Sequence, residues 1–177
     1  MYERTLSSRR LFQGRVVTLD VLDIELEDGH RSHRELVRHP GGVGILAREP
    51  DGHFLLVRQF RKAVESEVVE ICAGTVEPGE PREETARREL REETGREATR
   101  LVPLGDVYAS PGYTDEVVSL FFAECAPHPA AGAGDADERV ELVRATEAEI
   151  EEWIRQNLVR DAKTLAAWLL YRMQVRA

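Results

Sequence analysis

The spacing of apolar and polar residues changes several times along the chain, and each change predicts a boundary between elements. Three N-terminal segments are predicted to be strands: 5–12, 15–26 and 31–39. The second alternates apolar and polar residues partway, as a half-buried strand does, and the third is its return strand. Asp28-Gly29 separates the last two and is a tight-turn signal for a hairpin. We therefore expect an N-terminal β-region over residues 1–39, built around this hairpin.

The rest of the chain, residues 40–177, mixes short apolar runs with stretches of helical spacing. The runs predict strands at 43–47, 53–60, 67–72, 99–108, 116–124 and 139–145. Asp51-Gly52 predicts a second hairpin turn between the first two of them. Strands around a central helix, with further helices at the C-terminal end, predict an α+β or α/β sandwich.

Three stretches have the signals of helices. The central one includes Pro81, which suits a first helical position, and ends at Gly95, which suits a left-handed C-terminal residue. Thr146 and Glu149 form a capping box that starts a helix through residue 158, and Asp161 caps a last helix. We expect these two helices to be scaffold with the following residues inward: Ile150, Trp153 and Ile154 in the first, and Leu165, Trp168, Leu169 and Met173 in the second.

Composition narrows the class of protein. The chain has 177 residues, of which 42% are hydrophobic and 32% charged, as in a globular domain. No apolar run is long enough for a membrane span, and the first residues lack the apolar segment of a secretory signal, so we expect a cytoplasmic protein. The two cysteines, Cys72 and Cys125, lack metal spacing and are expected to be small core residues. A net charge of −9 disfavours binding to nucleic-acid phosphates.

One acidic stripe on the central helix needs an explanation. Glu89, Glu92 and Glu93 fall within about 100° of one another around a helix axis. A solvated surface helix is one reading, since neighbouring glutamates and arginines are spaced for helpful i,i+4 pairs. Glu89 and Glu93, however, form a repelling i,i+4 pair. Three convergent carboxylates are what a hard divalent cation prefers, so a metal site is the other reading.

The stretch from residue 74 to 96 resembles the Nudix box, G-x5-E-x7-R-E-U-x-E-E-x-G-U, where U is a bulky aliphatic residue. The positions in register are Gly74, Glu80, Arg88, Glu89, Leu90, Glu92, Glu93 and Gly95. Arg96 departs from the pattern at the last position, which packs the turn after the helix. The resemblance implies a Nudix fold over roughly residues 40–177, an α/β/α sandwich with a mixed sheet between helices, and a homodimer formed through the N-terminal β-region.

The resemblance also implies a set of metal and catalytic residues. Glu89, Glu92, Glu93 and the Ala73 carbonyl would hold Mg²⁺, with Mn²⁺ as the alternative, and Arg88 would orient the glutamates. Glu80 either binds metal through water or braces the loop. In the related ADP-ribose pyrophosphatases, a glutamate from a later loop acts as base or metal ligand. Glu138 fits this role best, after the Pro/Gly-rich stretch 126–136, with Asp137 and Glu141 as alternates.

Substrate residues are implied in the same way. Arg61 matches an arginine that helps to hold ADP-ribose, and Arg38 is a weaker candidate for the same work. Pro111 lies 15 residues after Arg96, as in Nudix enzymes that split ADP-ribose. Gly112 and Glu116 fit the surrounding S-P-G-x-[ST]-[DE]-E element. Glu70 faces either solvent or the substrate pocket.

The expected function follows from this resemblance. We expect hydrolysis of the pyrophosphate bond of ADP-ribose to AMP and ribose 5-phosphate. The alternatives are the same chemistry on another nucleoside diphosphate sugar, such as GDP-mannose, or a Nudix-like sensor that binds ADP-ribose without cutting it. The box does not separate these substrates, and it does not identify the general base or the number of metals.

Overall fold

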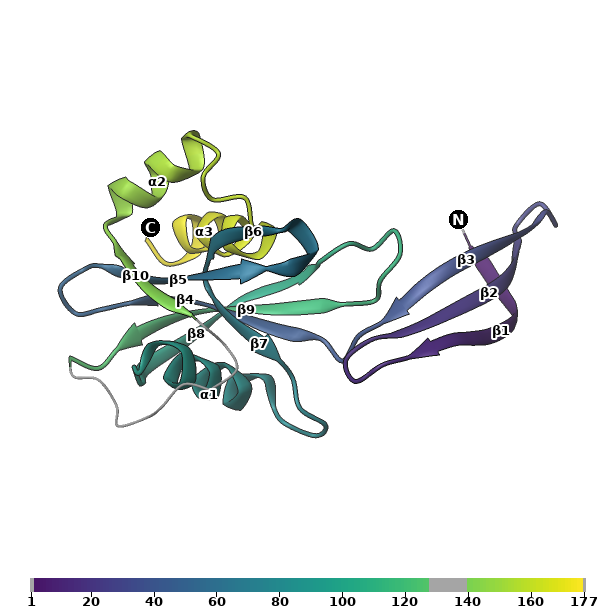
Figure 1. Cartoon of the computed structure of the whole chain (residues 1–177), viewed down its shortest axis with the longest axis horizontal. Coiled ribbons are helices and arrows are strands. Elements are labelled where there is room, and N and C mark those ends of the chain that lie inside the picture. Colours follow the sequence, from purple (N-terminus) through teal and green to yellow (C-terminus); the bar gives the residue numbers. More distant parts are fainter. Residues whose placement is uncertain (1, 128–139, 177) are drawn as a thin grey trace. The chain divides into compact units, whose positions relative to one another are not determined.

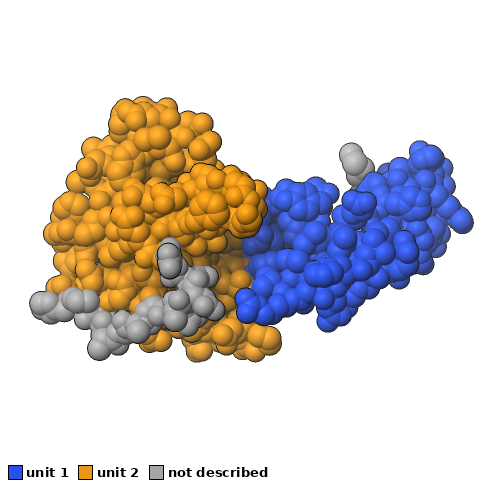
Figure 2. Space-filling view, in the orientation of Figure 1, with its two compact units in different colours: residues 1–41, 108–117 blue, residues 42–107, 118–177 orange. Residues whose placement is uncertain are grey.

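The computed structural model describes residues 2–127 and 140–176 and forms two compact units (Figure 2). One unit contains residues 1–41 and 108–117, and the other contains residues 42–107 and 118–177. The division made from the sequence assigned residues 108–117 to the second part. The structure groups them with the N-terminal strands.

The first unit is a three-stranded antiparallel sheet in the order β1-β2-β3 (Figure 1). Its strands are β1 Glu3–Gln13, β2 Thr18–Leu26 and β3 Arg31–Arg38. The hairpin expected at Asp28-Gly29 is confirmed, and Gly29 has the positive φ of 84° that its turn requires. β1 adds a third strand to this hairpin and is exposed along its whole length.

The segment 108–117 lies along the end of β3. The Val37 N–H donates to the Tyr113 carbonyl at 2.8 Å, and the Asp115 N–H donates to the Val37 carbonyl at 3.2 Å. Val37 and Thr114 thereby form an isolated parallel bridge. Backbone pairing explains why this turn belongs to the N-terminal unit despite its distance along the chain.

The second unit contains a mixed seven-stranded sheet with the path β10-β5-β4-β9-β8. Strand β6 pairs with β5 off this path, and β7 pairs with β4. The strands are β4 Gly42–Arg48, β5 Phe54–Arg61, β6 Ser66–Glu70, β7 Cys72–Thr75, β8 Ala98–Tyr108, β9 Val117–Cys125 and β10 Glu141–Ala145. β4 and β9 are parallel, whereas β4 and β5 are antiparallel.

The prediction of a single strand over residues 67–72 is wrong, because the strand is interrupted at Ile71 and forms β6 and β7. The Ile71 N–H leaves the sheet and donates to the Thr164 hydroxyl at 2.9 Å. The chain therefore stops pairing with β5 and begins to pair with β4. This step carries Ala73 and Gly74 to the central part of the sheet.

Helices cover both faces of this sheet (Figure 1). α1, Arg82–Thr94, packs on one face through Ala86 and Leu90. α2, Glu147–Arg155, and α3, Ala162–Gln174, pack on the other. A short 3-10 helix, η1, spans Lys62–Val64. The α/β/α sandwich expected from the sequence is confirmed. Among the described helices, none has both the length and the apolar character needed to cross a bilayer.

Most helix ends follow the sequence signals. Gly95 ends α1 with a left-handed φ of 64°, and the capping box of Thr146 and Glu149 is present. Pro81 is extended and precedes the helix instead of being its first residue. α2 ends earlier than residue 158, because Asn157 has a positive φ of 58° and turns the chain.

Both cysteines are buried, as expected.

The predicted buried face of α3 is partly wrong. Leu169 and Met173 are 59% and 68% exposed. The buried residues are Thr164, Ala167, Trp168 and Tyr171. Tyr171 decides the rotation, because its ring packs near Phe54 and Phe122 at centroid distances of 5.4 and 4.8 Å. An aromatic ring of this size outweighs the two flexible apolar side chains.

Candidate active site

α1 brings two glutamates against the backbone of β7. Ala86 and Leu90 are fully buried and dock the helix on the sheet. Glu89 and Glu93 lie one turn apart beside this apolar seam. Glu93 Oε2 accepts a hydrogen bond from the Ala73 N–H at 3.1 Å. The helix therefore fixes an acidic group at Ala73, the residue whose carbonyl the box resemblance implicates in metal binding.

Gly74 makes room for the second glutamate. A Cβ built at residue 74 would lie 1.9 Å from Cδ of Glu89 and 2.0 Å from its Oε1. No side chain can occupy that position while the Glu89 carboxylate stays in place. The glycine of the box is therefore explained by a close approach of carboxylate to backbone.

Arg88 gathers three carboxylates. Its Nε and Nη2 donate to the two oxygens of Glu80, each at 3.1 Å. Its Nη1 donates to Glu89 Oε1 at 2.7 Å and to Glu92 Oε2 at 3.0 Å. A planar guanidinium can make all four contacts at once, which a lysine cannot. Arg88 thus holds Glu80, Glu89 and Glu92 around one cation.

Glu80 is firmly ionised in this arrangement. The hydrogen bond from Arg88 lowers the pKa of Glu80 to about 2, although partial burial opposes this shift. Hydrogen bonds from the Thr85 hydroxyl and the Glu77 N–H lower it further. The hydrogen bond to Glu80, with those to Glu89 and Glu92, raises the pKa of Arg88. Of the two roles left open for Glu80, the structure shows contacts that brace the box loop.

The donor set suits a hard divalent cation in its chemistry. Glu89 and Glu93 place carboxylate oxygens beside the backbone of β7, and Glu92 is 38% exposed next to them. Within residues 2–127 and 140–176, however, no three His, Cys, Asp or Glu side chains form a preformed metal cluster. Glu89 and Glu92 point instead to Arg88. Each of these carboxylates has two oxygens, so one oxygen can bind the metal ion while the other accepts from the Arg88 guanidinium.

Arg61 and Glu70 form a second charged group in this unit. Glu70 is 1% exposed, so it faces neither solvent nor an open pocket. Its Oε1 accepts from Arg61 Nε at 2.6 Å, and its Oε2 accepts from Lys163 Nζ. Lys163 was missed by the sequence reasoning, which treated α3 as scaffold. The one signal was a glutamate inside an otherwise apolar run, because a buried carboxylate needs a cation.

The other predicted substrate residues lie in the N-terminal unit. Arg38 Nη1 pairs with Asp115 at 2.9 Å, and its Nε lies 3.4 Å from Asp20. Glu116 lies 3.6 Å from the His39 ring. Pro111 and Gly112 form a turn closed by a hydrogen bond from the Tyr113 N–H to the Ser110 carbonyl at 3.1 Å. Folding therefore brings Arg38 next to residues 110–116, the S-P-G-x-[ST]-[DE]-E element. Its partner there, Asp115, was not among the predicted site residues.

The predicted base is not among these positions. Glu138 and its alternate Asp137 lie outside the residues that the structure describes. The other alternate, Glu141, is 66% exposed and pairs with Arg58 at 3.1 Å.

Arg96, the one departure from the box, has a clear partner. Its Nη2 lies 2.8 Å from Glu49 Oε1, and Arg144 Nε lies 2.6 Å from Glu49 Oε2. Glu49 is 9% exposed, so the guanidinium neutralises a buried carboxylate where the pattern has an aliphatic residue. The departure concerns packing behind the helix and leaves the box carboxylates in place.

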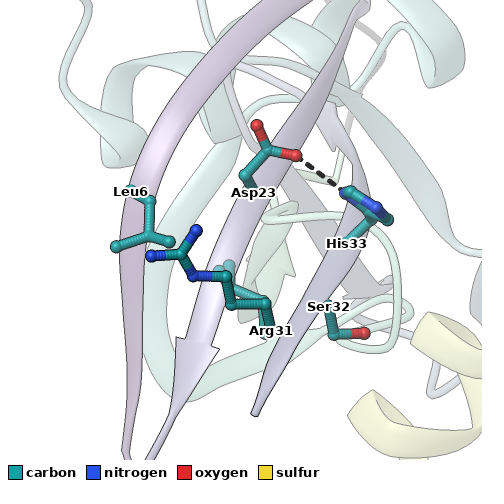
Figure 3. Close-up of a pocket in the computed structure, with 6 residues that line it drawn as sticks. Leu6, Asp23, Arg31, Ser32 and His33 are labelled. Carbon is teal, nitrogen blue, oxygen red and sulfur yellow. Dashed lines mark hydrogen bonds and ion pairs between the residues drawn. The ribbon is translucent and has the colours of Figure 1, made fainter. Parts of the chain in front are cut away.

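A separate hollow of about 370 Å³ lies on the N-terminal sheet (Figure 3). Its lining includes Asp23 and His33, whose Oδ1 and Nδ1 are 2.7 Å apart. Both side chains are more than half exposed. None of the predicted site residues lines this hollow, so it is not the candidate active site.

Comparison with known proteins decides the family. The NUDIX domain matches residues 38–169 of this chain. The chain belongs to the Nudix family. This confirms the resemblance first found in the box, and hydrolases of this family use divalent metals.

Several relatives of this Nudix protein span nearly its whole length. It is 42% identical over 166 residues to "ADP-ribose pyrophosphatase" of Bacillus subtilis (strain 168), covering 93% of this chain and 90% of the relative. It is 41% identical over the same coverage to "Methanol dehydrogenase activator" of Bacillus methanolicus. A "GDP-mannose pyrophosphatase" of Cronobacter sakazakii (strain ATCC BAA-894) is 34% identical, covering 87% of this chain and 85% of that one.

A solved structure extends the likeness to three dimensions. "Crystal structure of ADP compounds hydrolase" matches with a TM-score of 0.86 at 25% identity, covering 99% of this chain and 95% of that one. The Nudix fold expected from the box is therefore confirmed for this chain.

Proposed function

We propose that this Nudix enzyme hydrolyses the pyrophosphate bond of ADP-ribose to AMP and ribose 5-phosphate, with Mg²⁺ as its metal. The observation that carries the proposal is the set of box carboxylates fixed at Ala73 and Gly74 by α1 and Arg88. The choice of substrate is supported by the 42% identity to an ADP-ribose pyrophosphatase.

In this proposal Glu89, Glu92, Glu93 and the Ala73 carbonyl hold the metal. When bound, Mg²⁺, or Mn²⁺ in its place, would neutralise the pyrophosphate charge and lower the pKa of a bound water. The proposal is supported by the oxygen-only donors and by the closeness of Glu93 to the Ala73 backbone. These ligands come from a helix and a strand, which limits their movement during catalysis.

The remaining roles belong to groups around the carboxylates. Arg88 positions Glu89 and Glu92 and does not touch the substrate. Arg61 holds a substrate phosphate, which suits the forked donors of a guanidinium. Glu138 takes the proton from the attacking water or completes the metal shell, as the family resemblance implies. Substrate-binding roles for Arg38, Pro111, Gly112 and Glu116 stay predictions.

Assembly and location belong to the same proposal. We infer a homodimer formed through the N-terminal β-region, supported by the exposed apolar residues Leu11 and Phe12 of β1. We also infer a cytoplasmic enzyme, supported by two buried cysteines that form no disulfide.

Two other functions are weighed against this one. GDP-mannose hydrolysis is supported by the Cronobacter relative and uses the same box. A sensor that binds ADP-ribose without cutting it is disfavoured, because the three box glutamates and their positioning arginine are all present. The part of the site that binds the nucleobase would separate ADP-ribose from GDP-mannose as substrate. Measured turnover would separate an enzyme from a sensor.

A substrate panel tests the proposal. ADP-ribose, GDP-mannose, UDP-glucose, NADH and ATP would each be incubated with enzyme, Mg²⁺ and phosphatase, and released phosphate would be measured. The proposal predicts fastest turnover of ADP-ribose. Faster turnover of another nucleoside diphosphate sugar would keep the chemistry but overturn the substrate. Tight binding of ADP-ribose without any turnover would favour the sensor.

A further inference from the structure

Arg61 is held by one edge of its guanidinium. Its Nε donates to Glu70 Oε1 at 2.6 Å, and neither Nη atom makes a hydrogen bond or ion pair with any described residue. The side chain as a whole is 42% exposed. Burial by itself would lower the pKa of Arg61, but the Glu70 carboxylate, together with the charges of Asp161 and Glu93, raises it overall.

Glu70 is held in place by burial and by two cations, so its contact with Arg61 is costly to break. Its carboxylate is buried at the end of β6, with one oxygen on Arg61 and the other on Lys163. A buried carboxylate between two cations strongly favours keeping both contacts, since losing one leaves charge unpaired in a poorly solvated place. Glu70 therefore restricts the directions in which the Arg61 fork can point.

Lys163 is itself fixed by the start of α3. Asp161 caps this helix by accepting from the Thr164 N–H at 2.9 Å, and its other oxygen accepts from Lys163 Nζ at 2.9 Å. The Thr164 hydroxyl accepts from the Ile71 N–H beside Glu70. The helix start and the break between β6 and β7 are thus one hydrogen-bonded network, although 93 residues separate Glu70 from Lys163.

We propose that Glu70 and Lys163 are positioning residues that aim the two Nη atoms of Arg61, which have no partner among the described residues, at a phosphate group of the substrate. Lys163 acts through Glu70 and does not touch the substrate. Lys163 neutralises the second oxygen of Glu70. Glu70 can therefore orient Arg61 through Nε alone, and the two Nη atoms of Arg61 are left for the substrate. This inference rests on the proposed hydrolysis of a nucleoside diphosphate sugar. It gives α3 a role in substrate binding beyond scaffold.

Steady-state kinetics on the full-length enzyme with ADP-ribose and Mg²⁺ tests this role. The variants are Lys163→Met, the conservative Lys163→Arg, Glu70→Gln, Arg61→Met and the double variant Arg61→Met/Lys163→Met. Arg172→Met is the matched control, because Arg172 also lies on α3 and pairs at 3.1 Å with Glu147, away from the Glu70 network. Thermal melts of every variant report the folded state.

Lys163→Met should raise KM about tenfold with kcat within about twofold, because loss of an oriented phosphate contact weakens binding in ground and transition states alike. Lys163→Arg should recover most of this loss, and Arg172→Met should leave KM unchanged. In the Arg61→Met background, Lys163→Met should raise KM no further. Unchanged KM in Lys163→Met, or an equal rise in both backgrounds, overturns the proposal.

Two further outcomes separate this inference from the function on which it rests. If Lys163→Met does not fold, Glu70→Gln is used in its place and should also raise KM. Its side-chain amide has the shape of the carboxylate but carries no charge. If wild type cleaves another nucleoside diphosphate sugar, the same KM test is run on that substrate. In that case only the assignment of ADP-ribose fails. If wild type neither cleaves nor binds any of them, both proposals fail.

Discussion

Gly74 and Glu89 occupy adjoining space, so that a Cβ at residue 74 would lie 1.9 Å from Cδ of the Glu89 carboxylate. The backbone of Gly74 does not have a positive φ, so alanine is sterically allowed there by the main chain. The group that must move is the flexible end of a glutamate side chain. Geometry at this pair therefore bears on activity more than on stability.

Gly74→Ala should lower kcat/KM for ADP-ribose about 100-fold, because a displacement of about 1 Å in a catalytic group has an effect of that size. The melting temperature should change by only a few degrees, since Glu89 is free to turn away. Activity and thermal unfolding measured on the same preparation check both parts. Wild-type activity in Gly74→Ala would show that Glu89 is not needed where the structure places it.

Arg88 should control the affinity for metal through the carboxylates it holds. Arg88→Lys keeps the charge but loses the fork that contacts Glu80, Glu89 and Glu92. The Mg²⁺ concentration for half-maximal activity should rise about tenfold, as for other residues that orient metal ligands. Arg87→Lys is the control, because Arg87 lies next to it on α1 and donates to the Ala98 carbonyl at 2.9 Å instead of to a box carboxylate. Equal Mg²⁺ dependence in the two variants would contradict this role.

Glu80 gives the site a defined acid sensitivity. Its pKa falls from an ordinary value of 4.5 to about 2, first through the Arg88 hydrogen bond. A depressed carboxyl pKa adds stability that is present above the unfolded value and is lost as pH falls from about 4.5 towards 2. The melting temperature of wild type should exceed that of Glu80→Gln at neutral pH, and the gap should narrow across this acid range. A gap that stays constant with pH would rule out ionised Glu80 as its source.

The local geometry of the box was easier to predict from the sequence than the packing around it. Gly74, Arg88 and the box glutamates are local, because α1 and β7 are close in the chain and helical spacing alone puts Glu89 beside Glu93. The capping signals at Gly95 and Thr146 were equally local and correct.

What the sequence reasoning missed depends on distant contacts. The strand is interrupted where the Ile71 N–H donates to the hydroxyl of Thr164, 93 residues away in the chain. Tyr171 sets the buried face of α3 through rings on β5 and β9. Lys163 and Glu70 are likewise 93 residues apart in the chain. No periodicity within one segment encodes a partner in another segment, so these contacts were out of reach of pattern analysis.

Arg96 should be needed for stability and not for chemistry. Arg96→Leu restores the usual box residue but removes one of two cations from the buried Glu49. We expect a loss of about 1–3 kcal/mol in the free energy of unfolding, measured by urea denaturation. The double variant Arg96→Leu/Glu49→Leu should lose less than the sum of the single changes. Strict additivity would mean that the pair does not interact.

The most direct test of the central claim is product analysis for wild type and Glu93→Gln, each incubated with ADP-ribose and Mg²⁺. Glu93→Gln keeps an acceptor for the Ala73 N–H but removes the charge, so folding should persist while activity falls by about 100-fold or more. Wild type should yield AMP and ribose 5-phosphate in equal amounts. Intact ADP-ribose with wild type, or equal product formation by Glu93→Gln, would contradict metal-dependent hydrolysis at this site.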